Sequence, residues 1–105
     1  MQTDKDLEAI AGLDRVVHSP ARLMILAFLA AVDSADFTFL MNQVGLTRGN
    51  LSSHLKTLEE AGYVEIRKEF VDRVPHTLIQ LTDSGREAIQ AYRQQMRAIV
   101  DDLLG

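Results

Sequence analysis

The residues with the clearest capacity for specific chemistry lie between Thr47 and Lys56. This stretch holds two basic residues and no acidic one, and most of its other residues are small or polar. Arg48 and Asn50 can form hydrogen bonds with base edges in a DNA groove, while serine, threonine and lysine can bind phosphate oxygens. Small residues such as Gly49 let a helix axis come close to the bases. The stretch therefore indicates a surface for DNA rather than a catalytic centre.

The same stretch has the apolar spacing of a helix. Leu51, Leu55 and Leu58 fall on one side at 100° per residue, Thr47 can cap the start, and Gly62 can end it. The opposite side and the flanks hold Arg48, Gly49, Asn50, Ser52, Ser53, His54, Lys56 and Thr57. A plain solvated helix face is the alternative. Glycine and two adjacent serines are poor helix formers at exposed positions, which favours a face adapted to a partner.

The segments around this helix predict a helix-turn-helix over residues 37–62 followed by a hairpin over residues 63–81. Residues 37–44 form a short helix with Phe37, Leu40 and Val44 inward, and Gly45 stops it. Tyr63 to Phe70 alternates, with Val64, Ile66 and Phe70 on one face, as in a half-buried strand. Residues 71–76 form the turn and residues 77–81 the returning strand. Charge pairing is the simpler interpretation of Arg67, whereas the role of Lys68 stays open.

Two further helices precede the helix-turn-helix. The first spans residues 4–17, because its apolar residues Leu7, Ile10, Leu13 and Val17 have helical spacing. The second spans about residues 20–32, capped by Ser19 with Pro20 in its first turn. It is apolar nearly all round, so we expect it at the centre of the core. Residues 33–36 are expected to form a loop.

The last helix spans residues 83–104 and carries a narrow apolar stripe. Thr82, Asp83 and Ser84 open it, and Ser84 and Glu87 have the spacing of a capping box. Its apolar residues follow steps of 3, 4, 3 and 4, which is typical of a coiled-coil seam between two chains. Packing on its own domain is the alternative. The residues expected at a dimer interface are Leu7, Ile10, Ile89, Tyr92, Met96, Ile99 and Leu103.

Length and composition set the class of protein. The 105 residues are enough for one domain. The net charge is −4, but residues 47–80 carry five acids and five bases, so the excess acid lies outside the expected contact region. Cysteine is absent, and the three histidines lack the spacing of a metal site, so no metal or other cofactor is expected. No nucleophile motif or phosphate-binding glycine loop indicates an enzyme. An acidic, polar N-terminus and a longest apolar run of ten residues indicate neither a secretory signal nor a membrane helix.

The order of elements and three sequence motifs resemble the winged helix-turn-helix transcription regulators, above all the small MarR-like and ArsR-like proteins of prokaryotes. The motifs are Gly45-Leu46-Thr47 with Gly49-Asn50-Leu51-Ser52-Ser53-His54-Leu55, Leu58-Glu59-Glu60-Ala61-Gly62-Tyr63-Val64, and Leu81-Thr82-Asp83-Ser84-Gly85-Arg86. The resemblance covers about residues 13–95. It implies that the helix from Thr47 enters the major groove and that Ser52 and His54 touch DNA. It also implies that Arg73 at the wing tip reaches the minor groove or its phosphates. Many relatives have glycine at the wing tip where this chain has Asp72, and the cysteine pairs of metal-sensing members are lacking.

The expected protein is thus mainly α with a small β-hairpin: a single winged helix domain, residues 1–105, with dimerisation helices at 4–17 and 83–104. It would regulate transcription as a homodimer on double-stranded DNA with a near-palindromic operator, in the cytoplasm at the nucleoid. The expected DNA-binding residues are Thr47, Arg48, Asn50, Ser52, Ser53, His54, Lys56 and Arg73. A small-molecule effector is possible, but no residue identifies it. The alternative is a winged helix used for protein contacts, which the overall acidity favours.

Overall fold

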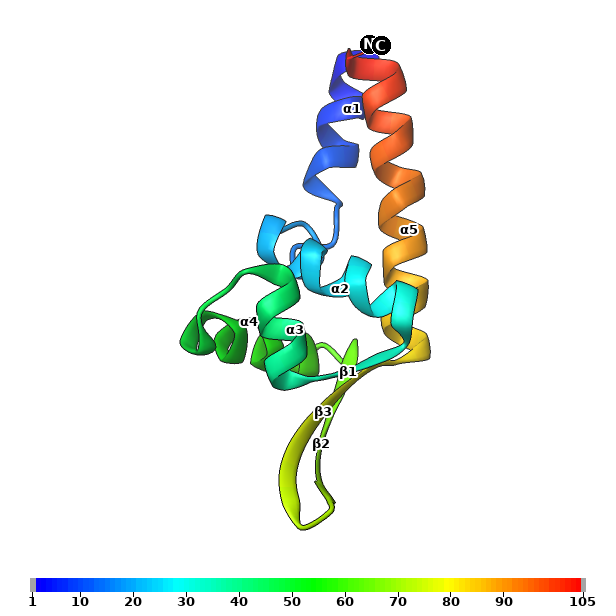
Figure 1. The fold of residues 1–105 in the computed structure, drawn as a ribbon. Coiled ribbons are helices and arrows are strands. Elements are labelled where there is room, and N and C mark those ends of the chain that lie inside the picture. Colours follow the sequence, from blue (N-terminus) through cyan, green and yellow to red (C-terminus); the bar gives the residue numbers. More distant parts are fainter. Residues whose placement is uncertain (1, 105) are drawn as a thin grey trace.

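The computed structural model describes residues 2–104 of the chain (Figure 1). In order, the elements are α1 (Gln2–Ala11), α2 (Pro20–Val32), β1 (Ser34–Asp36), α3 (Phe37–Val44), α4 (Arg48–Glu60), β2 (Val64–Val71), β3 (Val74–Leu81), α5 (Asp83–Ile99) and the π-helical turn η1 (Val100–Leu104). The three strands form one antiparallel sheet in the order β1-β3-β2. This arrangement confirms the winged helix fold predicted from the sequence.

The core of the body forms where α2, α3 and α4 pack over the base of the sheet. Ile25, Leu26 and Leu29 of α2 are fully buried there, as are Leu40 of α3 and Ile79 of β3. The predicted start of α2 is confirmed, since the Ser19 side chain accepts a hydrogen bond from the Arg22 N–H and proline stands at the first helical position. Only one side of α2 is buried, although the helix is apolar nearly all round.

The first helix is shorter than predicted. It ends at Ala11, and the predicted helix over residues 4–17 is wrong for its last six positions. The Asp14 carboxylate accepts hydrogen bonds from the backbone N–H groups of Val16 and Val17, a local turn that competes with helix. Leu13 and Val17 are nevertheless buried in the core, from the irregular segment 12–19 rather than from a helical face.

The loop predicted at residues 33–36 is also wrong, because Ser34–Asp36 pairs with β3 as a third strand. Ala35 lies opposite Ile79 and is buried with it. A strand of three residues is too short for an alternating pattern, and its partner lies more than forty residues further along the chain. Nothing local in the sequence therefore marks it.

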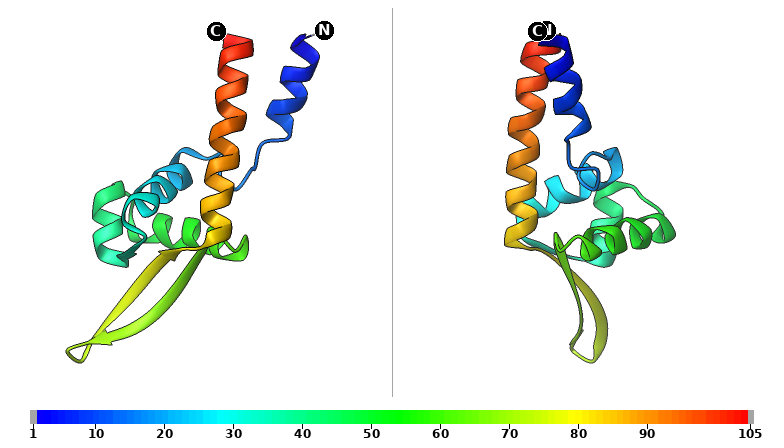
Figure 2. Two further views of the ribbon diagram at one scale, coloured as in Figure 1. Left: turned by 90° about the vertical axis from the view of Figure 1, so that its right-hand side faces the viewer. Right: turned by 180° about the vertical axis from the view of Figure 1, so that it is seen from behind.

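The wing spans the predicted residues, but its returning strand is longer and its turn tighter than predicted. β3 begins at Val74 rather than at residue 77, and only Asp72 and Arg73 connect the strands. Both turn residues have positive φ, 52° and 69°, as in the type I′ turns that suit two-residue hairpins. The hairpin projects beyond the body (Figures 1 and 2). Val64 is therefore buried as predicted, but Phe70 is 77% exposed and does not belong to the buried face.

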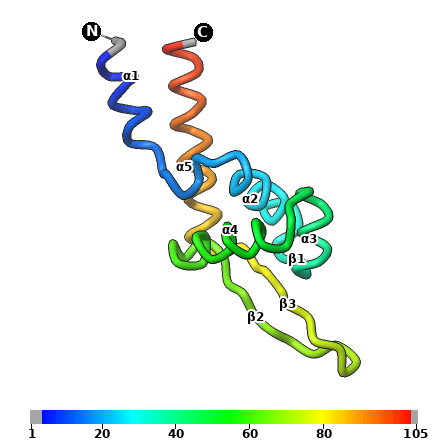
Figure 3. The backbone as a smooth tube through the Cα atoms, turned by 90° about the vertical axis from the view of Figure 1, so that its left-hand side faces the viewer, coloured from blue at the N-terminus to red at the C-terminus, as the bar shows by residue number. Residues whose placement is uncertain are grey.

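Helix α5 rises from the sheet at the opposite end from the wing tip. Its N-cap is Thr82, whose hydroxyl accepts the Gly85 N–H at 3.0 Å, so the capping box predicted at Ser84 is wrong. Figures 1 and 3 show α1 beside the C-terminal part of α5. We call α1, the C-terminal half of α5 and η1 the arm. None of the described helices is both long and apolar enough to cross a lipid bilayer.

Candidate nucleic-acid interface

Helix α4 is held at a defined angle by its caps and its leucines. Gly45 takes the left-handed conformation that ends α3, and the Thr47 hydroxyl accepts the Asn50 N–H at 3.2 Å to start α4. Leu51, Leu55 and Leu58 are at most 2% exposed. The predicted apolar stripe is thus confirmed, and the opposite side of α4 must face outward.

The outward side of α4 holds the predicted contact residues. Thr47, Arg48, Asn50, Ser52, Ser53 and Lys56 are all exposed, and His54 is half-buried on the flank. No acidic residue interrupts this surface before Glu59. The structure therefore brings seven of the eight predicted DNA-binding residues to one helix, in an arrangement that suits a polyanion.

Arg48 lies at the edge of a groove between α4 and the wing. Its guanidinium carbon is 5.2 Å from the centre of the Phe37 ring, a cation–π contact that restricts the side chain. The groove has a volume of about 780 Å³, and its lining includes Ser52 and Leu55 of α4 and Ile66 of β2. Arg48 is thus both a donor on the outward surface and part of the groove wall.

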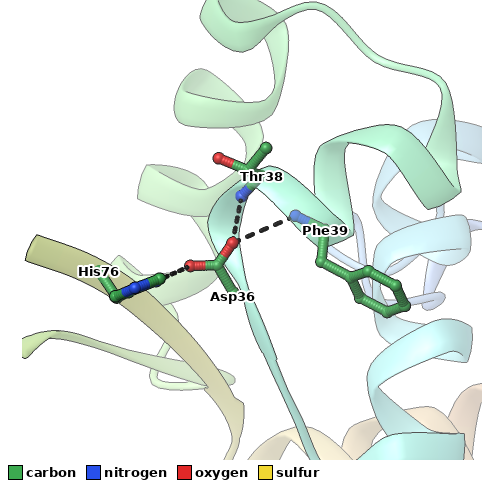
Figure 4. Close-up of polar contacts among 4 residues, drawn as sticks. All are labelled: Asp36, Thr38, Phe39 and His76. Carbon is green, nitrogen blue, oxygen red and sulfur yellow. Dashed lines mark hydrogen bonds and ion pairs between the residues drawn. The ribbon is translucent and has the colours of Figure 1, made fainter. Parts of the chain in front are cut away.

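Asp36 connects the wing to the helix-turn-helix (Figure 4). Its carboxylate accepts the N–H groups of Thr38 and Phe39 at 3.0 and 3.3 Å, which caps α3, and it lies 3.0 Å from Nδ1 of His76 on β3. The hydrogen bond with His76 is the main cause that lowers the pKa of Asp36 below 3.8. Sequence reasoning missed both residues, because the contact depends on the unanticipated strand β1.

Arg22 makes a second link that the sequence did not indicate. Its Nε donates to the Val16 carbonyl oxygen at 2.6 Å, and its Nη2 donates to the Arg15 carbonyl oxygen at 3.3 Å. Its Nη1 lies 3.1 Å from Nδ1 of His54 on α4. One side chain of α2 therefore joins the segment before α2 to the flank of the candidate recognition helix.

The far end of α4 is tied to the same segment. The Tyr63 hydroxyl donates a hydrogen bond to the Asp14 carboxylate, and this bond, with burial, raises the pKa of Tyr63 to about 12. Asp14 in turn holds the turn at Val16 and Val17. Segment 12–19 thus contacts the flank of α4 through Arg22 and the chain just beyond α4 through Tyr63.

Arg73 stands apart from the other predicted residues. It is exposed in the two-residue turn between β2 and β3. The tip of this hairpin lies away from α4 (Figure 1). Phe70, Val71 and Val74 around it are between 51% and 77% exposed. The charge pairing predicted for Arg67 is confirmed, since its Nε lies 3.9 Å from Glu69 and its Nη2 donates to Gln80 at 3.2 Å.

The predicted dimer residues fall into three groups. Leu7, Ile10 and Leu103 expose 56%, 38% and 38% of their surface on the arm. Tyr92 and Ile99 are buried inside the single chain, and the Tyr92 hydroxyl lies 2.6 Å from Nδ1 of His18. Ile89 and Met96 are half-buried. Part of the stripe on α5 therefore packs on its own chain, and only the first group lies exposed on the arm.

Comparisons with known proteins agree with this geometry. The family model of the winged helix DNA-binding domain matches residues 21–100. An uncharacterised protein of Methanocaldococcus jannaschii is 38% identical over 78 residues, which is 74% of this chain and 85% of that protein. A transcriptional regulator homologue from Pyrococcus horikoshii superposes with a TM-score of 0.85 at 33% identity, covering 94% of this chain and 97% of the other.

Two further solved structures place the fold among known regulators. A MarR-family regulator from Silicibacter pomeroyi has a TM-score of 0.63 at 25% identity, covering 94% of this chain and 66% of the other. The repressor CouR, solved on a 23-mer DNA duplex, has a TM-score of 0.72 at 25% identity, covering 98% and 70%. The MarR-like resemblance is confirmed.

Proposed function

Since the chain belongs to the winged helix DNA-binding family, we propose that it regulates transcription as a homodimer that binds a near-palindromic operator through α4. The observation that carries the proposal is the exposed side of α4, which has no acidic residue from Arg48 to Leu58 and is held outward by three buried leucines. The DNA-bound state of CouR, a protein of the same fold, supports the partner class. Such a regulator acts in the cytoplasm, at the nucleoid.

We assign the contacts of α4 by the reach of each side chain. Arg48, Asn50 and Ser53 contact base edges in the major groove, because arginine and asparagine can form paired hydrogen bonds with guanine and adenine. Thr47, Ser52 and Lys56 bind phosphates, which set the register of the helix but carry no sequence information. Arg73 adds a phosphate or minor-groove contact from the wing, weakened by the neighbouring charge of Asp72.

The homodimer rests on the exposed apolar residues of the arm. Leu7, Ile10 and Leu103, with the 44% exposed Val100, lie on elements that project away from the body. A twofold axis through paired arms would place the two α4 helices in successive major grooves, about 34 Å apart on DNA. A small molecule bound between arm and body would change this spacing, which is the form of regulation we propose for an effector still unidentified.

Contact with another protein, rather than DNA, is the second candidate function. The net charge of −4 favours it, because a polyanion is repelled by the chain as a whole. The two functions differ in their salt dependence. Binding to DNA releases counterions from each phosphate that a lysine or arginine neutralises, so the affinity falls linearly with salt on a logarithmic scale.

Removing single charges separates the two candidates. Lys56→Ala should weaken binding to all duplexes and lower the salt slope by about 1, whereas Arg48→Ala should cost about 1–3 kcal/mol only on the preferred sequence. Lys5→Ala, which removes one charge from the arm, is the matched control and should leave both quantities unchanged. If all three variants bind DNA as the wild type does, α4 is not the DNA-binding surface.

A further inference from the structure

In the contact between Arg22 and His54, only the arginine can donate the hydrogen bond. A guanidinium group has only N–H donors, so the nitrogen of His54 that faces it must act as the acceptor. That nitrogen is Nδ1, at 3.1 Å from Nη1. The contact therefore requires the neutral imidazole with its proton on Nε2, and it excludes the other tautomer.

Arg22 itself is fixed by two other bonds. Its Nε and Nη2 donate to the carbonyl oxygens of Val16 and Arg15, so the planar guanidinium cannot rotate without losing at least one of them. These carbonyls belong to segment 12–19, in which the Asp14 carboxylate stabilises a turn by accepting the N–H groups of Val16 and Val17. The two hydrogen bonds thus fix the guanidinium group with its Nη1 facing α4.

The remaining nitrogen of His54 is left free to bind a partner. Among residues 2–104 no hydrogen bond to Nε2 is found, and none of the buried side-chain nitrogen and oxygen atoms in that range lacks a partner. Nε2 therefore keeps contact with solvent. His54 lies one turn beyond Asn50 on α4, on the flank that faces α2, beside the outward side of the helix.

We propose that Arg22 is a positioning residue for DNA binding: it holds His54 in the Nε2–H tautomer and aims that N–H at a phosphate of the DNA strand beside α4. The inference rests on the proposed function for its partner, but the tautomer is a property of the free protein. Through Arg22, segment 12–19, which connects the arm to the body, is also linked to a side chain that contacts DNA. A change in the arm would thereby reach α4 through one guanidinium group.

The first test measures the tautomer without DNA. Long-range ¹H–¹⁵N correlation spectra of the histidine side chains, recorded at mildly alkaline pH, distinguish protonated from unprotonated ring nitrogens. We expect His54 to carry its proton on Nε2 in the wild type and to show a mixture of tautomers in Arg22→Met. Arg15→Met removes an equal charge from an exposed side chain of the same segment and should leave the His54 signals unchanged. A proton on Nδ1, or a mixture in the wild type, overturns the proposal.

The second test asks whether Arg22 acts on DNA through His54. On a duplex that the wild type binds, Arg22→Met and His54→Ala should each weaken binding by about tenfold, the usual effect of losing one hydrogen bond to a charged group. The double variant should be no weaker than His54→Ala, because the two residues act in series. Losses that multiply would show that Arg22 acts independently and would overturn the proposal.

Two further controls keep the result interpretable. His54→Gln places an amide N–H near the position of Nε2, so it should retain most of the affinity and be less sensitive to Arg22→Met. Thermal unfolding of each variant checks that the body is intact, and His54→Ala and His54→Gln remain informative if Arg22→Met does not fold. If the wild type binds no duplex at all, the proposed function fails and the phosphate contact with it, while the tautomer spectrum still decides the Arg22–His54 pairing.

Discussion

His76 and Asp36 meet 3.0 Å apart between the wing and the start of α3, although forty positions separate them in the chain. The same carboxylate caps α3 through the N–H groups of Thr38 and Phe39. One side chain therefore stabilises the first helix of the helix-turn-helix and the angle at which the wing leaves the body. The helix-turn-helix and the wing, both expected to contact DNA, are therefore linked by the contact between Asp36 and His76.

Replacing Asp36 should destabilise the fold in a pH-dependent way. Asp36→Ala should lower the free energy of unfolding at pH 7 by about 1 kcal/mol, the usual cost of a lost N-cap. The pKa of Asp36 is lowered in the folded state, so its contribution is present above 3.8 and is lost as the pH falls through the lower, folded-state value. Urea unfolding at pH 7 and at acid pH measures both. Glu8→Ala, an exposed change on α1, is the control; an equal deficit for Asp36→Ala at both pH values would contradict the account.

Tyr63 should titrate unusually late. Its pKa is raised to about 12 by the hydrogen bond to Asp14, whereas an unfolded tyrosine titrates at 10.0. Its contribution to stability is therefore complete below pH 10 and is lost as the pH rises towards 12. The chain has two tyrosines, so a rapid absorbance titration should lose the step near pH 12 in Tyr63→Phe and keep it in Tyr92→Phe. If Tyr63→Phe keeps that step, the late titration does not belong to Tyr63 and the prediction is wrong.

Two glycines should respond in opposite ways to alanine. A Cβ at Gly85 would collide with the Tyr63 carbonyl oxygen and come within 2.8 Å of a Leu81 methyl carbon, while one at Gly49 would meet nothing within 4 Å. Gly85→Ala should therefore destabilise the protein by about 1–3 kcal/mol. Gly49→Ala should stabilise it by up to about 1 kcal/mol, because alanine is the better helix former.

Gly49 also tests the use of α4. If small side chains let the helix approach the bases, Gly49→Ala should weaken DNA binding although it stabilises the fold. Calorimetric unfolding and a DNA titration on the same sample give the two numbers. A variant that is both more stable and an equal binder would remove Gly49 from the contact surface.

The arm should control the oligomeric state. Leu7→Asp places a charge on a large apolar residue of α1 that is 56% exposed and should convert dimers to monomers in sedimentation velocity, with the helix content preserved. Val71→Asp makes the same change on the wing and should leave the dimer intact. Ile99→Asp is not a clean probe, because Ile99 is 5% exposed within one chain and its replacement would disturb the arm itself. A dimer that survives Leu7→Asp would place the interface elsewhere.

Local signals in the sequence predicted the parts of the fold that local physics determines. The leucine stripe of α4, its cap at Thr47 and the end of α3 at Gly45 depend on neighbouring residues, and all three are confirmed. The returning strand of the wing was predicted too short, because Pro75 and His76 are typical of a turn. Pro75 instead lies within β3, on the part of the strand beyond the three residues that pair with β1, where a missing N–H is tolerated.

Of the candidate site, the sequence predicted only the part that lies on the single helix α4. Asp36, His76 and Arg22 were missed, because each acts through a partner at least thirty residues away. The stripe on α5 shows the same limit. Its spacing is that of a coiled-coil seam, but Tyr92 is hydrogen-bonded to His18 and Ile99 is buried, both within the same chain. Spacing alone does not distinguish a partner chain from the same chain.

Selection from a random pool of duplex DNA, sequenced after binding at two salt concentrations, would show whether the protein recognises an operator as a homodimer. We expect enrichment of an inverted repeat whose half-sites lie one helical turn apart, with binding that weakens as salt rises. A single, unrepeated half-site would contradict the homodimer. No enrichment even at low salt would contradict DNA recognition by α4 and favour a protein partner for this winged helix.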